Sequence, residues 1–170
     1  MNSIINLAET GLGITGIRNL GMIGIEPFLT KYKDYFNGRV LDYGCGEQPY
    51  KDLVSGKYVP YDDGYHAKRK GKTFPKYSGH FDTVLLTQVI QFLPRLGKVI
   101  SSFDTDHLVI TFPVNWYIVQ REDLFRYTPN GLKYILRKCG FKTIVSENLS
   151  HIKFKDITFP LQHGIIAEKK

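Results

Sequence analysis

Cysteine is scarce in this sequence, with Cys45 and Cys139 the only two among its 170 residues. Two thiols so far apart do not form the disulfide framework typical of small secreted domains, so the sequence predicts a reducing, cytoplasmic location. No run of eighteen or more apolar residues occurs, and we therefore expect no membrane span. Because the sequence has no C-x-x-C or H-x-x-x-H spacing and no dense carboxylate cluster, it predicts no metal site.

An excess of acidic charge is also missing, since lysine and arginine outnumber aspartate and glutamate and the formal net charge is +7. A basic chain can bind nucleic acid or another anionic partner, but a solvated, lysine-rich surface explains the charge equally well. The hydrophobic fraction of 42% is ordinary, and this length suits one globular domain. The oligomeric state does not follow from these features.

The stretch 39–49 (R-V-L-D-Y-G-C-G-E-Q-P) organises the rest of the chain. Its apolar start is typical of a strand buried in a parallel sheet. Gly44 and Gly46 then permit a tight turn with positive φ and let a ligand approach the backbone. Pro49 suits the first turn of a helix. Strand, glycine turn and helix start together predict the first unit of a Rossmann-like sheet, with its ligand at the carboxyl end of the strand.

The glycine spacing also indicates the kind of ligand. Dinucleotide sites use G-x-G-x-x-G, and here the third glycine is absent after Gly46. Asp42, two positions before Gly44, would repel a phosphate but suits a cationic ligand. The run V-L-D-Y-G-C-G-E-Q-P-Y resembles the first motif of class I S-adenosylmethionine (SAM) methyltransferases. That resemblance implies that residues 44–46 pack against the methionine and ribose parts of SAM.

Two later segments resemble the same family, and they follow in the family's order. Residues 81–94 (F-D-T-V-L-L-T-Q-V-I-Q-F-L-P) are similar to its central-strand motif, and residues 123–141 resemble a late segment of one large methyltransferase group. The resemblance covers roughly residues 25–170 and implies a single SAM-binding domain. The implied fold is α/β, with a Rossmann-like, seven-stranded, mostly parallel sheet in the order 3-2-1-4-5-7-6. The last strand would be antiparallel, and helices would cover both faces.

The N-terminal residues 1–24 are predicted to form an arm packed on the domain, or alternatively a flexible lid over the SAM site. Residues 11–16 match G-x-G-x-x-G letter for letter, but no strand precedes them, so we treat the match as a decoy.

Local patterns predict the remaining elements. Helices are expected over residues 3–10, 26–36, 49–55, 95–103 and from Thr128-Pro129 to Gly140. Strands are expected over residues 57–61, 82–87, 107–112, 141–147 and 164–169, with the family's third strand in 64–78. Loop or surface positions are expected for His80, His151 and His163.

The cofactor site requires a group that binds the ribose diol, and Rossmann-type sites use an acid about twenty residues after the glycine turn. Asp62 is the first candidate and Asp63 the second, because Asp63 also fits a turn in D-D-G. No acid occurs between Asp63 and Asp82, so adenine would contact backbone groups and either Phe74 or Tyr77. The predicted cofactor-binding residues are Asp42, Tyr43, Gly44, Cys45, Gly46, Gln48, Pro49, Asp62, Asp63, Phe74, Thr87 and Gln88.

Catalysis with SAM mainly requires alignment of a nucleophile with the methyl group, because the sulfonium already activates that methyl. A base is needed only when the acceptor must lose a proton early. Where many relatives carry Glu-His, this chain has Gln91-Phe92. Asp123 and Arg126 are three residues apart, and an ion pair is the alternative to a catalytic role. The candidate catalytic residues are Gln91, Asn115, Tyr117, Arg126 and Tyr127.

Our first hypothesis is a SAM-dependent methyltransferase that releases S-adenosylhomocysteine and methylates an oxygen or nitrogen of a small-molecule or sugar acceptor. A catalytically inactive binding or structural module is one alternative, because the adenine-binding acid and the Glu-His pair are missing. A nucleic-acid methyltransferase is another, supported by the net charge and by residues 68–72 (K-R-K-G-K). The N/D-P-P-Y/F/W and Pro-Cys motifs of DNA methyltransferases are absent, which weakens that alternative.

Overall fold

The computed structural model describes residues 3–6, 22–63, 71–115, 121–154 and 157–170. The strands are β1 (Ser3–Asn6), β2 (Arg39–Tyr43), β3 (Lys57–Tyr61), β4 (Phe81–Thr87), β5 (Thr105–Pro113), β6 (Phe141–Phe154) and β7 (Ile157–Lys169). The helices are α2 (Ile25–Lys31), α4 (Leu96–Ser101) and α5 (Pro129–Lys138). Short 3-10 turns are η1 (Lys33–Phe36), η2 (Lys51–Leu53) and η3 (Ile90–Phe92).

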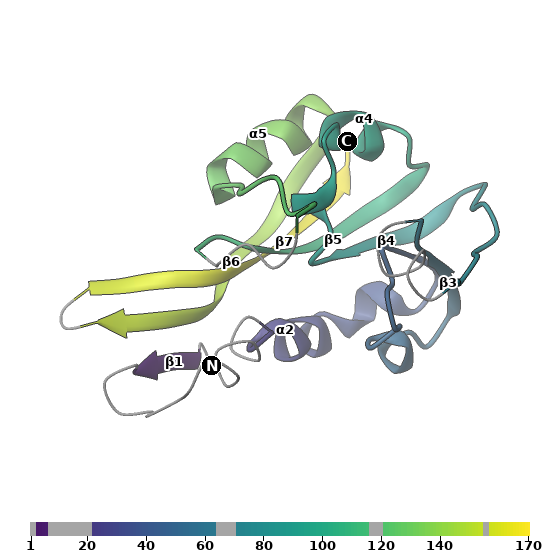
Figure 1. Ribbon diagram of the computed structural model, residues 1–170. Coiled ribbons are helices and arrows are strands. Elements are labelled where there is room, and N and C mark those ends of the chain that lie inside the picture. The colour runs from purple at the N-terminus through teal and green to yellow at the C-terminus, as the bar shows by residue number, and fades with distance from the viewer. Residues whose placement is uncertain (1–2, 7–21, 64–70, 116–120, 155–156) are drawn as a thin grey trace.

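One mixed sheet contains all of these strands, in the order β1-β6-β7-β5-β4-β2-β3 (Figure 1). Strands β3, β2, β4 and β5 are parallel, and β7 is antiparallel to both β5 and β6. The six strands other than β1 form the Rossmann-like α/β sheet that the sequence predicts, with its antiparallel last strand.

The predicted order 3-2-1-4-5-7-6 is wrong at both edges of the sheet. The described part of the region 64–78 contains no strand, so β3 is the edge strand there. At the opposite edge, β1 pairs in parallel with the outer part of β6, with Ser3 opposite Ser150. An N-terminal strand therefore adds to a core of six strands, and the family's third strand is not seen in the described residues.

Two predicted helices are also wrong. Residues 3–6 of the predicted helix 3–10 form β1, because the open edge of β6 offers backbone partners to this segment; residues 7–10 lie outside the described residues. Residues 49–55 contain only the turn η2, since Val54 is already extended and Gly56 passes against the Gly38 backbone. A Cβ at Gly56 would lie 2.0 Å from the Gly38 carbonyl oxygen. The chain thus returns to the sheet before a helix can form.

The other helices form close to their predicted bounds. The predicted helix 26–36 is divided into α2 and η1. Helix α5 begins as its sequence indicates, because the Thr128 hydroxyl accepts a hydrogen bond from the Gly131 N–H at 3.0 Å. Gly140 follows the helix with φ 84°, as expected for a helix stop. The described residues contain no helix long and apolar enough to cross a membrane.

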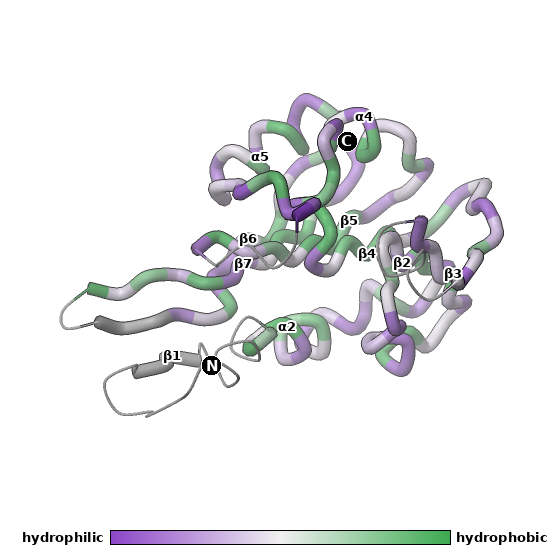
Figure 2. The backbone as a smooth tube through the Cα atoms, viewed as in Figure 1, coloured by the Kyte–Doolittle hydropathy of each residue, from purple (hydrophilic) through white to green (hydrophobic). Residues whose placement is uncertain are grey.

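Helices cover both faces of the sheet and enclose two hydrophobic clusters. Helices α4 and α5 lie on one face, where Leu132 and Leu136 are fully buried (Figure 1). Helix α2 lies on the other face and buries Phe28 and Leu29. Hydrophobic residues are concentrated in the central strands β4 and β5 (Figure 2). The two layers hold the carboxyl ends of these strands in fixed positions, which is where a ligand site is expected.

Candidate functional site

A cavity of about 550 Å³ opens at the carboxyl ends of β2, β3 and β4. This volume lies within the usual range of small-molecule sites, roughly 300–1,000 Å³. The described residues that line it are Met22, Asp42, Tyr43, Gly44, Cys45, Gly46, Glu47, Pro49, Tyr50, Asp62, Asp63, Thr87, Gln88, Val89, Phe92, Leu93 and Glu122. Most of the predicted cofactor-binding residues therefore lie around one cavity.

The glycine turn forms one wall of this cavity. The N–H groups of Gly44 and Cys45 donate to the Tyr61 carbonyl at 2.7 and 3.1 Å, which ties the turn to the end of β3. Gly44 has φ 81°, and a Cβ there would lie 2.4 Å from the Val89 side chain. Gly46 has φ 51° and open space around the position of a Cβ. Gly44 is thus required for packing, while Gly46 leaves room beside the turn.

The lining carries five acidic side chains, and none of the described lining residues is basic. Asp42 is 2% exposed and accepts a hydrogen bond from the Tyr58 hydroxyl at 2.6 Å. Burial raises the pKa of Asp42 to about 6, and the nearby Asp62 carboxylate adds to the shift. This concentration of carboxylates favours a cationic ligand over a phosphate.

Asp62 and Asp63 follow β3 and reach the cavity from the neighbouring strand. The Asp62 Oδ2 atom accepts the Gly46 N–H at 3.2 Å, so this carboxylate also braces the glycine turn. Asp63 accepts from the Tyr61 hydroxyl at 3.0 Å. Both acids therefore lie where the sequence predicts a partner for a ribose diol, and the geometry does not favour one over the other.

The end of β4 supplies the opposite wall. Gln88 has φ 54°, an uncommon conformation for a residue other than glycine. Its side-chain amide donates to Gln162 at 2.9 Å, and its backbone N–H donates to the Thr111 carbonyl at 2.9 Å. The Thr87 hydroxyl is buried without a hydrogen-bond partner among the described residues. A polar atom left unpaired on a cavity wall is consistent with a ligand that would pair with it.

Two of the predicted cofactor-binding residues, Gln48 and Phe74, are not in the lining. The apolar wall consists instead of Val89, Phe92 and Leu93. The sequence argument missed these three because they follow β4 in an apolar run that equally predicts buried core. Tyr77 packs against other aromatic rings, with its centroid 4.8 Å from that of Tyr61.

The candidate catalytic residues that the structure describes do not line the cavity. Gln91 is 4% exposed, and its side-chain amide donates to the Gln88 carbonyl at 2.8 Å. Its backbone carbonyl accepts the N–H groups of Leu124 and Phe125, both at 3.1 Å. Arg126 forms a two-pronged ion pair with Asp123, with Nη2 to Oδ2 at 2.8 Å, as the alternative interpretation predicts.

The remaining candidates have other roles or lie outside the described residues. Asn115 donates from its side-chain amide to the Pro160 carbonyl at 2.9 Å. Tyr127 packs against the hydrophobic cluster of α4 and α5. Tyr117 lies outside the described residues. The side chains of Asn115 and Tyr127 thus serve the scaffold around the cavity.

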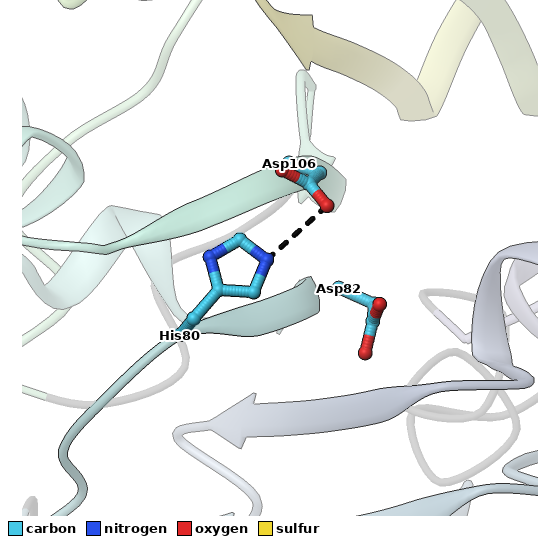
Figure 3. A group of neighbouring side chains, drawn as sticks. All are labelled: His80, Asp82 and Asp106. Carbon is cyan, nitrogen blue, oxygen red and sulfur yellow. Dashed lines mark hydrogen bonds and ion pairs between the residues drawn. The ribbon is translucent and has the colours of Figure 1, made fainter.

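A second group of ionisable side chains lies at the other end of the sheet. His80, Asp82 and Asp106 approach each other there, with their possible ligand atoms within 4.8 Å of one another (Figure 3). His80 Nδ1 lies 3.1 Å from Asp104, and Nε2 lies 3.2 Å from Asp106. Hydrogen bonds to these two carboxylates raise the pKa of His80. Asp82 also accepts the Arg39 N–H at 2.6 Å. Ion pairs and hydrogen bonds within the group account for this arrangement.

This cluster was not foreseen from the sequence, because its members are up to 26 residues apart. They meet because the first residues of β4 and β5 pair with each other. The prediction of no metal site stays a prediction.

The prediction for His163 is wrong, since this residue lies in β7 and is 5% exposed. Its Nδ1 lies 2.7 Å from Asn148 Oδ1, and its Nε2 lies 2.9 Å from the Ser146 hydroxyl. The ring can therefore donate to Asn148 and accept from Ser146 in its neutral form. Burial, with a contribution from the charge of Lys133, lowers the pKa of His163 to about 4.

Comparison with known proteins identifies the architecture. No protein-family model matches the sequence, and no curated protein matches it. A SAM-dependent methyltransferase from Archaeoglobus fulgidus matches with a TM-score of 0.63 and 20% identity, over 85% of this chain and 93% of that chain. Magnesium protoporphyrin IX methyltransferase (ChlM) from Synechocystis PCC 6803, solved with bound SAM, matches with a TM-score of 0.63 and 14% identity, over 95% and 86%.

The fold is that of SAM-dependent methyltransferases. The 16S rRNA methylase ArmA also has this methyltransferase fold, with a TM-score of 0.57 and 16% identity over 92% of this chain and 88% of that chain. The cavity occupies the place where open α/β sheets bind ligands, outside the carboxyl ends of the parallel strands.

Proposed function

We propose that this chain binds SAM in the cavity and transfers its methyl group to an oxygen or nitrogen of an acceptor. The observation that carries the proposal is the acidic lining of the cavity: five carboxylates and no basic residue in the described lining, on a methyltransferase fold. SAM carries a sulfonium and an ammonium group, so this lining complements the charge of the cofactor. A phosphate-bearing dinucleotide would be repelled by the same residues.

The chain offers surroundings for the ribose, the linking chain and the adenine of SAM. Asp62 and Asp63 are the candidates for the ribose diol, and the space beside Gly46 would take the chain that links ribose to methionine. Val89 and Phe92 form an apolar surface for adenine, in place of the predicted Phe74. Bound SAM would supply an electrophilic methyl group on sulfur, and S-adenosylhomocysteine would be the product.

Acceptor orientation is the main contribution that we assign to the protein in catalysis. We propose a small-molecule or sugar hydroxyl or amine as the acceptor, as the sequence suggests. Residues 25–170 would form the SAM-binding domain and residues 1–24 an arm or lid. Met22, at the end of that arm, lines the cavity and is 48% exposed, which supports a covering role.

The direct test is calorimetric titration of the wild-type protein and an Asp62→Asn variant with SAM. Asparagine keeps an acceptor for the Gly46 N–H but loses the charge, so SAM affinity should fall by about 1–3 kcal/mol, or roughly 5- to 150-fold. Asp34→Asn, at an exposed acid in η1 outside the cavity lining, is the matched control and should bind normally. Equal affinities for the wild type and Asp62→Asn would exclude Asp62 as the ribose partner, and no SAM binding by the wild type would exclude the proposed function.

A binding or structural module on the same fold is the second candidate function. It is favoured by the use of Gln91 and Arg126 in bracing contacts rather than in the cavity lining. Such a module would bind SAM or S-adenosylhomocysteine without turnover. Product formation with any oxygen or nitrogen acceptor, measured as S-adenosylhomocysteine release, would decide in favour of the enzyme.

A further inference from the structure

A second concave surface lies between α5 and the start of β6, and its charge is opposite to that of the SAM cavity. This α5–β6 groove has a volume of about 500 Å³. Lys133, Arg137, Lys142 and Lys170 line it, and no acidic residue does so in the described part of the chain. Figure 1 shows α5 lying along β6 on the face of the sheet that also carries α4.

Most of this positive charge is not neutralised by neighbouring side chains. Lys133, Arg137 and Lys170 form no ion pair with the described residues, and Lys142 pairs with Glu168 at 3.5 Å with both side chains exposed. Lys133 and Arg137 are four residues apart on α5, a spacing at which like charges destabilise a helix. The whole helix, P-N-G-L-K-Y-I-L-R-K, contains no acid to offset them. A bound anion would relieve this repulsion.

An exposed aromatic ring lies among these cations. Tyr134 lines the groove and is 54% exposed. The Arg137 guanidinium carbon lies 5.5 Å from the centre of the Tyr134 ring, and Lys138 Nζ lies 5.7 Å from it. Exposed aromatic rings beside basic side chains are the usual platform on which single-stranded nucleic acids stack their bases.

We propose that the α5–β6 groove binds a single-stranded nucleic acid, with its phosphates on Lys133, Arg137 and Lys170 and one base on Tyr134. This inference goes beyond the proposed function and does not depend on methyl transfer. Helix α5 runs back from the carboxyl end of the sheet, so its first turn is the end of the groove nearer the SAM cavity. A bound strand could therefore extend from the groove toward the cavity.

The test measures binding of fluorescently labelled oligo-uridine and oligo-thymidine of about twelve nucleotides by anisotropy. We expect the wild type to bind at about 50 mM salt. The logarithm of its association constant should fall linearly with the logarithm of the salt concentration, with a slope of about −0.7 for each phosphate contacted. The double variant Lys133→Glu/Arg137→Glu should bind at least about tenfold more weakly and show a shallower salt dependence. Tyr134→Leu should weaken binding without changing the salt dependence, because it removes stacking and no charge.

The matched control is Lys33→Glu/Lys57→Glu, which makes the same change in net charge at exposed positions on η1 and β3. If both double variants lose the same amount of oligonucleotide affinity, the binding depends on net charge alone and the proposed site in the groove is wrong. Absence of wild-type binding would overturn the proposal as well. So would displacement of the oligonucleotide by inorganic phosphate when the phosphate concentration only equals that of the phosphates in the oligonucleotide. Calorimetry with SAM gives an independent result: a variant that binds SAM normally is folded, and failure of the wild type to bind SAM would leave the groove result unaffected.

Discussion

Asp42 is the residue whose surroundings most directly connect structure with function. It lies at the end of a buried strand, borders the cavity and has a pKa of about 6 because burial disfavours its charged form. The Tyr58 hydroxyl partly offsets this effect by donating to the carboxylate. Asp42 can therefore change its charge near neutral pH, whereas an exposed aspartate would be ionised throughout this range.

A pH-dependent affinity for SAM follows from this pKa. Below about pH 6 the Asp42 carboxyl is neutral and no longer attracts a cation, so SAM should bind up to about tenfold more weakly at pH 5 than at pH 8. Titrations across this range would measure the effect. Asp42→Asn cannot titrate and should give a flat profile; the same slope in that variant would show that another group is responsible.

At the residue scale, a site residue can be predicted from the sequence when its role depends on backbone conformation or on a short motif. Gly44, Gly46 and Asp42 are recognisable because strand, turn and acid follow one another in the chain. Gln91 and Arg126 are different, because their roles depend on which neighbour their side chains meet after folding. Gln91 meets the Gln88 carbonyl and Arg126 meets Asp123, and only the second contact has a local signal, the spacing of three residues.

At the scale of elements, the turn after β2 allows two glycines with different roles to be separated. Gly44→Ala should lower stability by about 1–3 kcal/mol, because its Cβ would meet Val89 and its φ of 81° disfavours alanine. Gly46 also has a positive φ, but a Cβ there would meet no neighbour. Gly46→Ala should therefore lower stability less than Gly44→Ala does, and it should lower SAM affinity more. Urea unfolding and SAM titration of both variants would test this, and it fails if the two variants lose stability and affinity in equal proportion.

Elements were predictable from the sequence where local pattern and tertiary contacts agree. Helix α5 has a cap, an apolar stripe and a glycine stop, and its bounds were predicted closely. Strand β1 and the turn η2 were not, because each depends on a distant partner: β1 on the edge of β6, and η2 on the early return of the chain to β3. The strands β6 and β7 run 14 and 13 residues, well beyond the alternating segments that predicted them, because they pair with each other past the sheet.

At the scale of the whole molecule, the charge is segregated. The cavity gathers acids and the α5–β6 groove gathers cations, although the net charge is +7. Composition alone predicts the sign of the total and not this division. The two surfaces are consistent with two different ligands, a cationic one at the strand ends and an anionic one beside α5.

Stability of the whole protein should depend on His163. Its pKa is about 4 in the folded state against about 6.5 in an unfolded chain, so the unfolded state binds more protons between these values. Stability should therefore fall as the pH drops from about 6.5 toward 4, by roughly 1–3 kcal/mol, and should show no contribution from His163 above that range.

Urea unfolding of the wild type and His163→Gln at pH 4.5 and 7 would measure this contribution. Glutamine can keep a hydrogen bond to Asn148 or Ser146 but cannot titrate, so the variant should lose less stability on acidification. The difference between the proteins isolates His163 from Asp42, whose raised pKa acts in the opposite direction over the same range. Identical losses in both proteins would contradict the assignment.

The position of β1 has a consequence for how the chain reaches its folded state. Ser3 lies opposite Ser150, so β1 pairs with a strand that lies 147 residues later in the chain. Contacts between such distant parts of a chain form slowly, because a long loop must close before they add stability. Helices and inner strands can assemble earlier, and the outer edge of β6 stays open until β1 arrives. During that interval the same edge is open to β1 of another copy, so late pairing of β1 would leave the protein exposed to strand exchange between molecules.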